Sequence, residues 1–385
     1  MIRSARLIFI RVELMIQRKS FLTRAIFQVH LWGGLALGLY VFFIGLTGSV
    51  LVFHEEILHS MAPRPRVAVT EVTPNLEQIR AGIQAGNPSW YPWSLEAPWE
   101  PGEPWGSYLL KSGSGGKMVF ADAEGHVVGE INNQGTWLEL CEQFHSFLLL
   151  PKGRLYNGIA GLVLVALALS GLYLWWPARG EWNTAFRIVR RSNWKGWVYD
   201  LHRVGGVLML GFIVLSGVTG GYFTWPAVYK YIAASLLPSK PIQKAKPVLT
   251  EGMRLPVDQL VASAQLALPG TKLVRVLVPN GSKQAVTVVL AHGITKDDRS
   301  RNTSQLTMHP YSGELLAIDD YRQRRAGDHL VSWLGPLHTG HFGGFWVKVV
   351  WALAGLSLPA MFITGFLIWC NRVLAPRLVR RKVHQ

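Results

Sequence analysis

Long apolar stretches dominate the pattern along this chain. Four of them are long enough to cross the hydrocarbon core of a bilayer as helices, which takes roughly 20 residues. They occupy residues 31–53, 155–176, 204–225 and 345–369, and charge is almost absent from them apart from Lys348. A soluble protein could bury one such helix. Four of them, rich in glycine and ending in tryptophan or phenylalanine, predict a mainly α-helical membrane protein with four transmembrane helices.

The segments between the first and second spans, and between the third and fourth, have a mixed pattern. Each contains a short amphipathic helix, expected at residues 76–86 and 256–268, followed by short runs typical of strands. The expected strands cover residues 106–111, 117–120 and 126–131 in the first segment, and 272–278, 285–290, 305–308 and 314–318 in the second. We therefore expect two small α+β modules, with an irregular, tryptophan-rich loop at residues 87–105.

The first and third spans are two versions of one sequence, which indicates an internal repeat. Without a gap, His30, Gly33, Gly34, Gly45, Thr47 and Gly48 correspond to His202, Gly205, Gly206, Gly217, Thr219 and Gly220. The second and fourth spans match more loosely, through Gly161, Gly171 and Trp175 with Gly355, Gly365 and Trp369. Upstream of these, His145 corresponds to His338. Each half should therefore be a helix, a module and a second helix, and the halves should be parallel repeats.

Basic residues flank the spans and account for much of the net charge of +16. They gather in the N-terminus, in the loop after the second span and in the tail, so the positive-inside rule predicts that these three segments face the cytoplasm of a bacterial inner membrane. Membrane lipid explains this charge better than nucleic acid does. The first span is too long for a signal peptide, and no small-residue cleavage site follows it, so we expect it to be retained.

The expected organisation follows from the spans and their orientation. It consists of a cytoplasmic N-terminus (1–29), a first span (30–54), a periplasmic module (55–136), a second span with a periplasmic extension (137–177), a basic cytoplasmic loop (178–200), a third span (201–228), a second periplasmic module (229–332), a fourth span with a periplasmic extension (333–371) and a cytoplasmic tail (372–385).

The repeat singles out two pairs of histidines. His30 and His202 lie at the cytoplasmic ends of equivalent spans, whereas His145 and His338 precede the apolar parts of the other two, roughly 10–15 Å beyond them if the helices continue outward. An ionisable side chain at a membrane is costly and suggests a function. A six-coordinate b-type haem needs two neutral imidazoles, one on each face. Two pairs at two depths predict two haem b groups, although any single histidine could simply be an interfacial hydrogen-bonding residue.

Other residues are secondary candidates for the same sites. His341 lies three residues beyond His338 on nearly the same helix face, so it is a reserve ligand together with His54. Arg203, Arg154 and Lys348 could pair with haem propionates, or could simply extend toward lipid headgroups. The chain has no C-x-x-C-H motif and only two cysteines, which excludes covalent c-type haem and iron–sulfur clusters.

Three motifs carry a family resemblance. The paired H-x-x-G-G…G-x-T-G helices, the L-H-T-G-H-F-G-G sequence before the last span and the S-G-L-Y-L-W-W-P end of the second resemble the PepSY-associated transmembrane family over nearly the whole chain. The chain is most similar to the ferrisiderophore reductases of that family, including ferrioxamine-linked ones. The resemblance implies two haems ligated by His30, His145, His202 and His338, and the reduction of siderophore-bound iron in the periplasm.

This activity is chemically reasonable, because hard hydroxamate or catecholate oxygens hold ferric iron better than ferrous iron. The glycine cluster at residues 112–116 is not followed by a helix, so no nucleotide site is expected, and the electron donor should be a quinol, another protein or a cytoplasmic reductant. The alternatives are a quinol-linked cytochrome b with another periplasmic acceptor, a non-redox protein whose modules bind peptides, and a transporter. A transporter would have broken helices and a polar site at mid-membrane.

Overall fold

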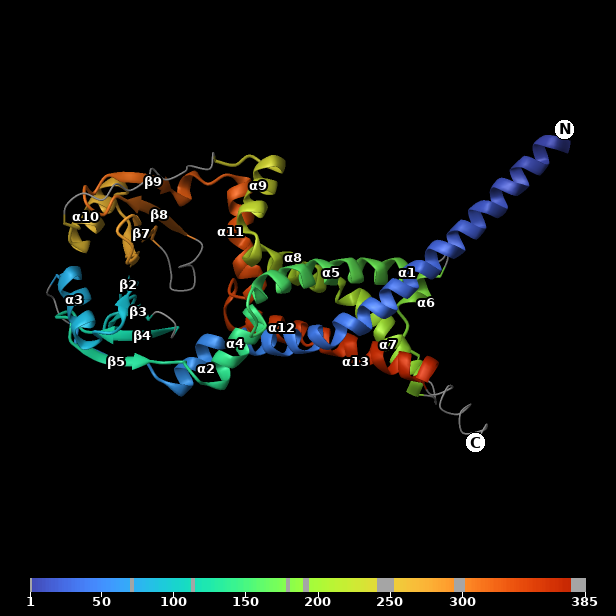
Figure 1. The fold of residues 1–385 in the computed structure, drawn as a ribbon, viewed down its shortest axis with the longest axis horizontal. Coiled ribbons are helices and arrows are strands. Elements are labelled where there is room, and N and C mark those ends of the chain that lie inside the picture. Colours follow the sequence, from blue (N-terminus) through green and yellow to red (C-terminus); the bar gives the residue numbers. More distant parts are fainter. Residues whose placement is uncertain are drawn as a thin grey trace. The chain divides into compact units, whose positions relative to one another are not determined.

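The computed structural model describes residues 2–69, 73–111, 115–177, 181–189, 194–240, 253–293 and 302–374, without the side chains of residues 2–20. Parts of the expected basic loop, glycine cluster and tail lie outside these ranges. The chain divides into two compact units (Figure 1). The helical unit comprises Met1–Val52, Cys141–Pro226 and Leu334–Gln385, and the sheet unit comprises Phe53–Leu140 and Ala227–Trp333.

Long apolar helices form the helical unit. They are α1 (Ile2–Leu51), α5 (Gly153–Trp175), α7 (Trp194–Leu208), α8 (Leu210–Thr224), α12 (Gly344–Gly355) and α13 (Ser357–Trp369), with the short α6 (Trp182–Ala185) and a final π-helical turn (Cys370–Leu374). Three stretches of the described chain are long and apolar enough to cross a membrane, namely Phe21–Leu51, Gly153–Trp175 and Gly344–Leu374. With α7 and α8 as one bent span there are four, as the sequence predicted.

The third span is bent, which the sequence analysis missed. Helices α7 and α8 meet at Met209 at an angle of 58°. The Gly205-Gly206 pair and Gly211 flank this point, and closely spaced glycines weaken a helix enough to allow a kink. The equivalent part of α1 carries Gly33, Gly34 and Gly38 and is nevertheless continuous, so glycines permit the bend but do not by themselves cause it. The residues next to the bend are leucines, so the bend is not the mid-membrane polar site that a transporter would have.

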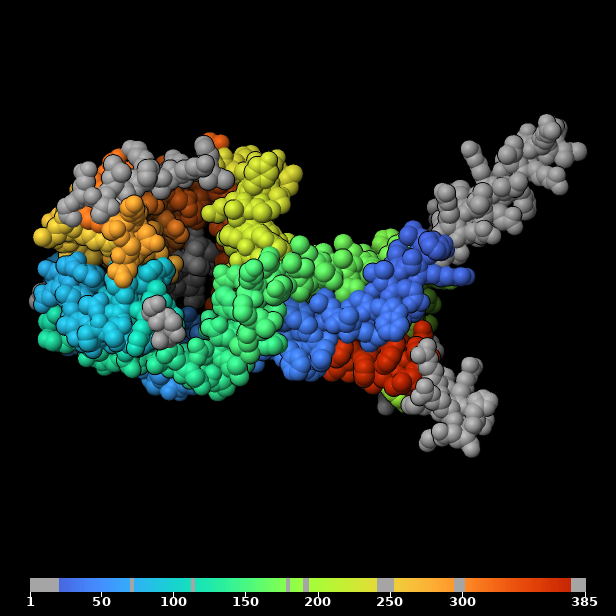
Figure 2. Space-filling model, viewed as in Figure 1, coloured from blue at the N-terminus to red at the C-terminus, as the bar shows by residue number. Residues whose placement is uncertain are grey.

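Glycines set the closest helix crossings. Helix α5 packs along α8, and α1 packs along α13 and α5; Figure 2 shows α1 in blue between green α5 and the red last helices. A Cβ atom on Gly217 would lie 2.8 Å from the carbonyl oxygen of Gly161, and one on Gly45 would lie 3.0 Å from that of Gly355. Small residues let helix backbones approach closely in membranes. Between the helices, Val41, Ile213 and Leu358 form a buried apolar core.

His145 and His338 lie on two short helices, α4 (Trp137–Phe147) and α11 (Ala326–Thr339). The expectation that the second and fourth spans continue outward through them is wrong, because tight turns separate these helices from α5 and α12. Leu148, Leu149 and Lys152 have positive φ angles of 55°, 53° and 60° in the first turn, and glycines take such angles in the second. A left-handed residue ends a helix.

The strands of the sheet unit form one nine-stranded antiparallel sheet in the order β5-β4-β3-β2-β6-β7-β8-β9, with β1 beside β3. They are β1 (Tyr91–Pro92), β2 (Ser94–Glu96), β3 (Trp105–Leu110), β4 (Gly116–Ala121), β5 (Val127–Ile131), β6 (Lys272–Leu277), β7 (Val286–Ala291), β8 (Thr303–Met308) and β9 (Leu315–Asp319). The two expected modules therefore share a sheet, which β2 joins through its pairing with β6. The expectation of an irregular loop at residues 87–105 is wrong, since β1 and β2 lie there.

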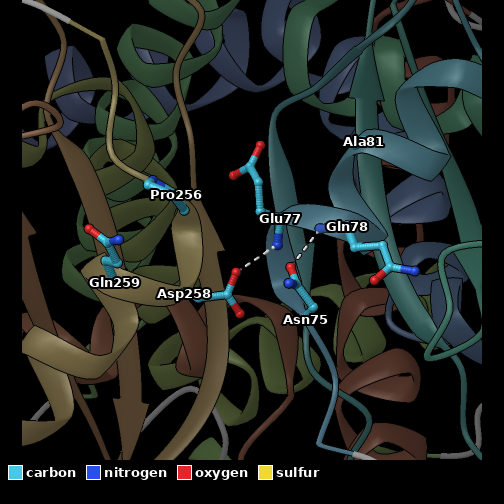
Figure 3. Close-up of a pocket in the computed structure, with 7 residues that line it drawn as sticks. All are labelled: Asn75, Glu77, Gln78, Ala81, Pro256, Asp258 and Gln259. Carbon is cyan, nitrogen blue, oxygen red and sulfur yellow. Dashed lines mark hydrogen bonds between the residues drawn. The ribbon is translucent and has the colours of Figure 1, made fainter.

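Helices α3 (Leu76–Gly86) and α10 (Val257–Ala267) pack on this sheet and bury Ile79, Ile83 and Leu260 in its core. Their first turns cap one another. Asp258 accepts hydrogen bonds from the amides of Leu76 (2.8 Å) and Glu77 (3.0 Å), the second of which Figure 3 shows, and Glu77 accepts one from the amide of Val257 (3.1 Å). Carboxylates stabilise helix N-termini in this way.

A cavity of about 490 Å³ lies beside these reciprocal caps, lined by Asn75, Glu77, Gln78, Ala81, Pro256, Asp258 and Gln259 (Figure 3). Burial alone would raise the pKa of Glu77, but hydrogen bonds from Arg80 and from the Val257 amide outweigh it and lower that pKa. Helix α2 (His54–Met61), helix α9 (Pro226–Leu236) and a 3₁₀ turn (Tyr321–Gln323) complete the unit.

Candidate functional site

The helical unit brings the four repeated histidines together as two pairs. His30 of α1 faces His202 of α7, with 6.4 Å between the ring centroids and 76° between the ring planes. His145 of α4 faces His338 of α11, with corresponding values of 6.2 Å and 48°. We call these the inner pair and the outer pair. Members of each pair come from equivalent positions of the two halves.

Each histidine contacts a hydroxyl group on a neighbouring helix through Nδ1. In the inner pair, His30 lies 2.9 Å from Oγ of Ser170 and His202 lies 2.9 Å from Oγ1 of Thr364. The outer pair has the same arrangement at 3.1 Å, through Thr47 for His145 and Thr219 for His338. Nδ1 of His30 also lies 3.2 Å from the carbonyl of Leu167, three residues before Ser170.

These contacts determine which ring nitrogen carries the proton. Each hydroxyl donates its own hydrogen to a carbonyl of its helix, at 2.8 Å for Thr47 and at 2.7 Å for Ser170, Thr219 and Thr364. It must therefore accept from the histidine, so Nδ1–H is the donor. The lone pair of the neutral imidazole then lies on Nε2. In metal-binding histidines, a hydrogen bond from the ring nitrogen that does not bind the metal fixes the tautomer and the orientation of the ring.

A glycine follows each hydroxyl residue and supports the histidine ring. A Cβ atom at these glycines would lie 2.8 to 3.2 Å from Cε1 of the ring, for Gly48 with His145, Gly171 with His30, Gly220 with His338 and Gly365 with His202. The glycine pairs one turn after His30 and His202, which are Gly33-Gly34 and Gly205-Gly206, have other neighbours. A Cβ on Gly33 would instead meet Leu167, and one on Gly205 would meet Met361.

Sequence reasoning missed this hydroxyl–glycine dipeptide as a unit. It occurs in each of the four spans, as Thr47-Gly48, Ser170-Gly171, Thr219-Gly220 and Thr364-Gly365, and the third span also contains Ser216-Gly217. The repeat identified the first and third of these as equivalent, but it did not indicate that they contact histidines from another helix. A search for one dipeptide common to all four spans would have found them.

The spacing within each pair would allow both imidazoles to bind one metal ion. An imidazole nitrogen binds a metal at about 2 Å, so two rings on opposite sides of one ion have centroids roughly 6 Å apart. Both pairs have this spacing. In the described chain, no three His, Cys, Asp or Glu side chains gather as a metal site made by protein alone would require. Two neutral imidazoles form the donor set of a six-coordinate haem.

The reserve ligands lie elsewhere. His341 follows the end of α11, and its Nδ1 lies 3.0 Å from the carbonyl oxygen of Thr339. It is His338 that faces His145. His54 begins α2 and belongs to the sheet unit, whereas both pairs belong to the helical unit.

The basic residues suggested as propionate partners have other surroundings. The Arg203 guanidinium donates to the carbonyls of Ala185 (2.8 Å) and Arg187 (3.0 Å) and lies 3.5 Å from the carboxylate of buried Asp200. It therefore holds the loop before α7. Arg154 lies over the Phe147 ring, 4.8 Å from its centroid, and Lys348 is half-buried in α12.

Comparison with known proteins gives one family. No curated protein matches the chain. Residues 27–372, which include all four paired histidines and all four hydroxyl–glycine dipeptides, match the family described as the PepSY-associated TM region. The chain therefore belongs to the PepSY-associated transmembrane family.

Proposed function

We propose that this protein is a di-haem b electron-transfer protein of the bacterial inner membrane, an oxidoreductase that reduces ferric siderophores in the periplasm. The observation that carries the proposal is the pairing of four histidines, each with Nδ1–H donated to a hydroxyl. In the proposal, His30 and His202 ligate one haem near the cytoplasmic face, and His145 and His338 ligate another near the periplasmic face.

The chain contributes position, orientation and exclusion of water. Haem b, when bound, supplies reversible one-electron transfer. The hydroxyl groups hold each imidazole in the tautomer that a metal needs. The distance along α1 from His30 to Thr47, which contacts His145, corresponds to about 25 Å of helix, so the two pairs lie in series across the thickness of a membrane. Along α1, Val41 lies between His30 and Thr47 and packs in a buried apolar core with Ile213 of α8 and Leu358 of α13.

The orientation supports delivery of electrons outward. Basic residues flank the spans on the side of both termini, which the positive-inside rule assigns to the cytoplasm. The two halves are then parallel repeats, and both modules lie in the periplasm, where a bulky ferric complex has access. Arg154 and Lys348 lie near the starts of α5 and α12, which follow α4 and α11, so they are candidates for the propionates of the outer haem alone.

The reaction needs one electron for each iron. A ferric hydroxamate complex gains an electron and becomes a ferrous complex, which its hard oxygen ligands hold weakly. A quinol would supply two electrons and release two protons, and so serve two complexes; a cytoplasmic reductant is the other donor class. No general acid or nucleophile is needed, because no covalent bond of the siderophore breaks.

The proposal can be tested with purified, fully reduced protein under anaerobic conditions. Addition of a ferric hydroxamate siderophore should reoxidise the haem bands and release one ferrous ion, captured by ferrozine, for each electron lost. A His338→Ala variant should react far more slowly. Haem that stays reduced with ferric siderophore but is reoxidised by cupric ion would favour the quinol-linked cytochrome with another acceptor.

A further inference from the structure

The outer histidines are anchored a second time, through the main chain of the helices that carry them. In the first half, the side-chain amide of Asn157, on α5, donates to the carbonyl oxygen of His145 itself. The amide oxygen of Asn157 in turn accepts a hydrogen bond from the Tyr40 hydroxyl on α1. The carbonyl of His145 lies in the last turn of α4, where a helix leaves carbonyls without intrahelical donors.

The second half makes the same connection with different chemistry. The indole N–H of Trp351, on α12, donates to the carbonyl oxygen of Leu337, the residue before His338, at 2.7 Å. Phe212 packs edge-on against this indole at 5.8 Å. A Cβ atom on Gly340, which has a φ angle of +75°, would lie 3.0 Å from Cβ of Trp351, so the turn after α11 also fits closely around this side chain.

The two anchors occupy equivalent positions in the repeat. The spacing that relates His30 to His202 also relates Tyr40 to Phe212, and the spacing that relates Gly161 to Gly355 also relates Asn157 to Trp351. A polar Tyr–Asn pair in one half therefore replaces a Phe–Trp pair in the other, while the contact to a carbonyl at or beside the outer histidine is kept in both.

Only the outer histidines need such anchors. His30 and His202 lie within α1 and α7, both of which pack along α13. His145 and His338 lie near the ends of the short helices α4 and α11, which tight turns separate from the spans. A hydrogen bond from the following span is what fixes the end of each short helix at a set depth.

We propose that Asn157 and Trp351 are positioning residues that hold the outer histidine pair in register for its haem. They act through the backbone of α4 and α11 rather than through the imidazole rings. This inference rests on the proposed function, because it concerns the orientation of the ligands of one of the two haems. It predicts that loss of either anchor affects the outer haem and spares the inner one.

The test uses full-length protein in detergent, with Asn157→Leu and Trp351→Phe as the variants. Trp346→Phe is the matched control, since this tryptophan lies on the same helix α12 and is 76 % exposed. The readouts are the rate of haem transfer to apomyoglobin and the electron paramagnetic resonance spectrum of the oxidised protein. The outer haem is identified as the signal that His338→Ala removes and that His30→Ala leaves.

Trp351→Phe should release the outer haem about five-fold faster, because one hydrogen bond contributes roughly 1 kcal/mol. Asn157→Leu should release it faster still, because it removes the bond to His145 and the bond from Tyr40. The low-spin signal of the same haem should shift, with the inner haem and the Trp346→Phe protein unchanged. Tyr40→Phe, a milder change that keeps the Asn157–His145 contact, should shift the outer signal in the same direction by less.

Two results would overturn the inference. One is that both anchor variants have the same spectra and haem-release rates as the wild type. The other is an equal change in both haems, which would indicate a general loss of packing. If the wild-type protein contains two haems and both anchor variants behave like it, this inference is wrong but the proposed function stands. Wild-type protein without haem would remove the proposed function and this inference with it.

Discussion

Four histidines on four different helices share one set of neighbours. Each donates Nδ1–H to a serine or threonine hydroxyl and lies with Cε1 against the glycine that follows it. A histidine that served only as an interfacial hydrogen-bonding residue would not need the same tautomer and the same support at every position. The repeated environment favours one role for all four, and that role requires a free lone pair on Nε2.

Removing a single hydroxyl should weaken the haem site that it serves. Thr219→Val keeps the shape of the side chain but leaves Nδ1 of His338 without its hydroxyl acceptor. We expect roughly ten-fold weaker binding of the outer haem, at the lower end of the range for such orienting partners. Ser170→Ala should weaken the inner haem by less, because Nδ1 of His30 also lies 3.2 Å from the carbonyl oxygen of Leu167.

To measure this effect, part of the haem is extracted from each variant and haem is then titrated back to give its affinity. Thr224→Val is the control on helix α8, since the Thr224 hydroxyl donates to the carbonyl of Arg154 at 2.9 Å. Haem affinity in Thr219→Val equal to that of the wild type would show that the hydroxyl does not orient the ligand.

The sheet unit contains a buried carboxylate whose charge makes stability depend on pH. Burial alone would raise the pKa of Asp320, but hydrogen bonds and charge from Arg322, with the charge of His292, outweigh it and lower the pKa below the ordinary value. A carboxyl group whose pKa is lower in the folded than in the unfolded state stabilises the fold at pH values above its unfolded pKa. This stabilisation is lost as the pH falls through the folded pKa. Stability should therefore fall below about pH 4.

Thermal melting followed by circular dichroism between neutral and acid pH measures this dependence. Asp320→Asn should melt at a lower temperature at pH 7, because Arg322 loses its partner at 3.0 Å, and should then change less on acidification. Asp319→Asn, at an exposed neighbour that pairs with Arg324, should keep the wild-type acid sensitivity. An unchanged acid slope in Asp320→Asn would contradict the assignment.

At the scale of helices and strands, the sequence predicted the elements that an internal repeat or a periodic pattern of apolar residues reveals. The four spans, the helices α3 and α10 and most strands lie close to the expected residues, because long apolar runs and alternating strands are local signals. The bend at Met209 and the separation of α4 and α11 from the spans depend on tertiary packing. Strand β2 is only three residues long, and its pairing with β6 joins segments far apart in the sequence.

The candidate site was predictable to the same extent. The repeat identified His30, His145, His202 and His338, because aligning the two halves of the sequence shows which positions are equivalent. The hydroxyl groups of Ser170 and Thr364 were not identified, since their contacts cross between helices.

The α5–α8 crossing should tolerate no side chain at its closest point. Gly217→Leu would place atoms where the backbone of Gly161 lies, and overpacking of this kind typically costs 1–3 kcal/mol. Gly211→Ala on the same helix, where a Cβ would meet no atom within 4 Å, should be neutral or slightly stabilising. The melting temperatures of the two purified variants compare them. Equal melting temperatures would show that this crossing does not limit stability.

At the scale of the whole molecule, each unit has a distinct task in the proposed function. The helical unit carries both histidine pairs, which lie in series along helices long enough to span a membrane. The sheet unit carries the two segments between the spans of each half and joins them through one sheet. A duplicated half with one inner and one outer histidine yields two complete pairs only when both halves are present.

The most direct test of this arrangement is the haem content of the purified full-length chain. Pyridine haemochrome analysis, with oxidised and dithionite-reduced spectra, should give about two b-type haems per chain, both low-spin. Alanine at either member of one histidine pair should remove the same single haem and leave the other. Protein from haem-sufficient cells that contains no haem would contradict the proposal and favour a non-redox protein whose modules bind peptides.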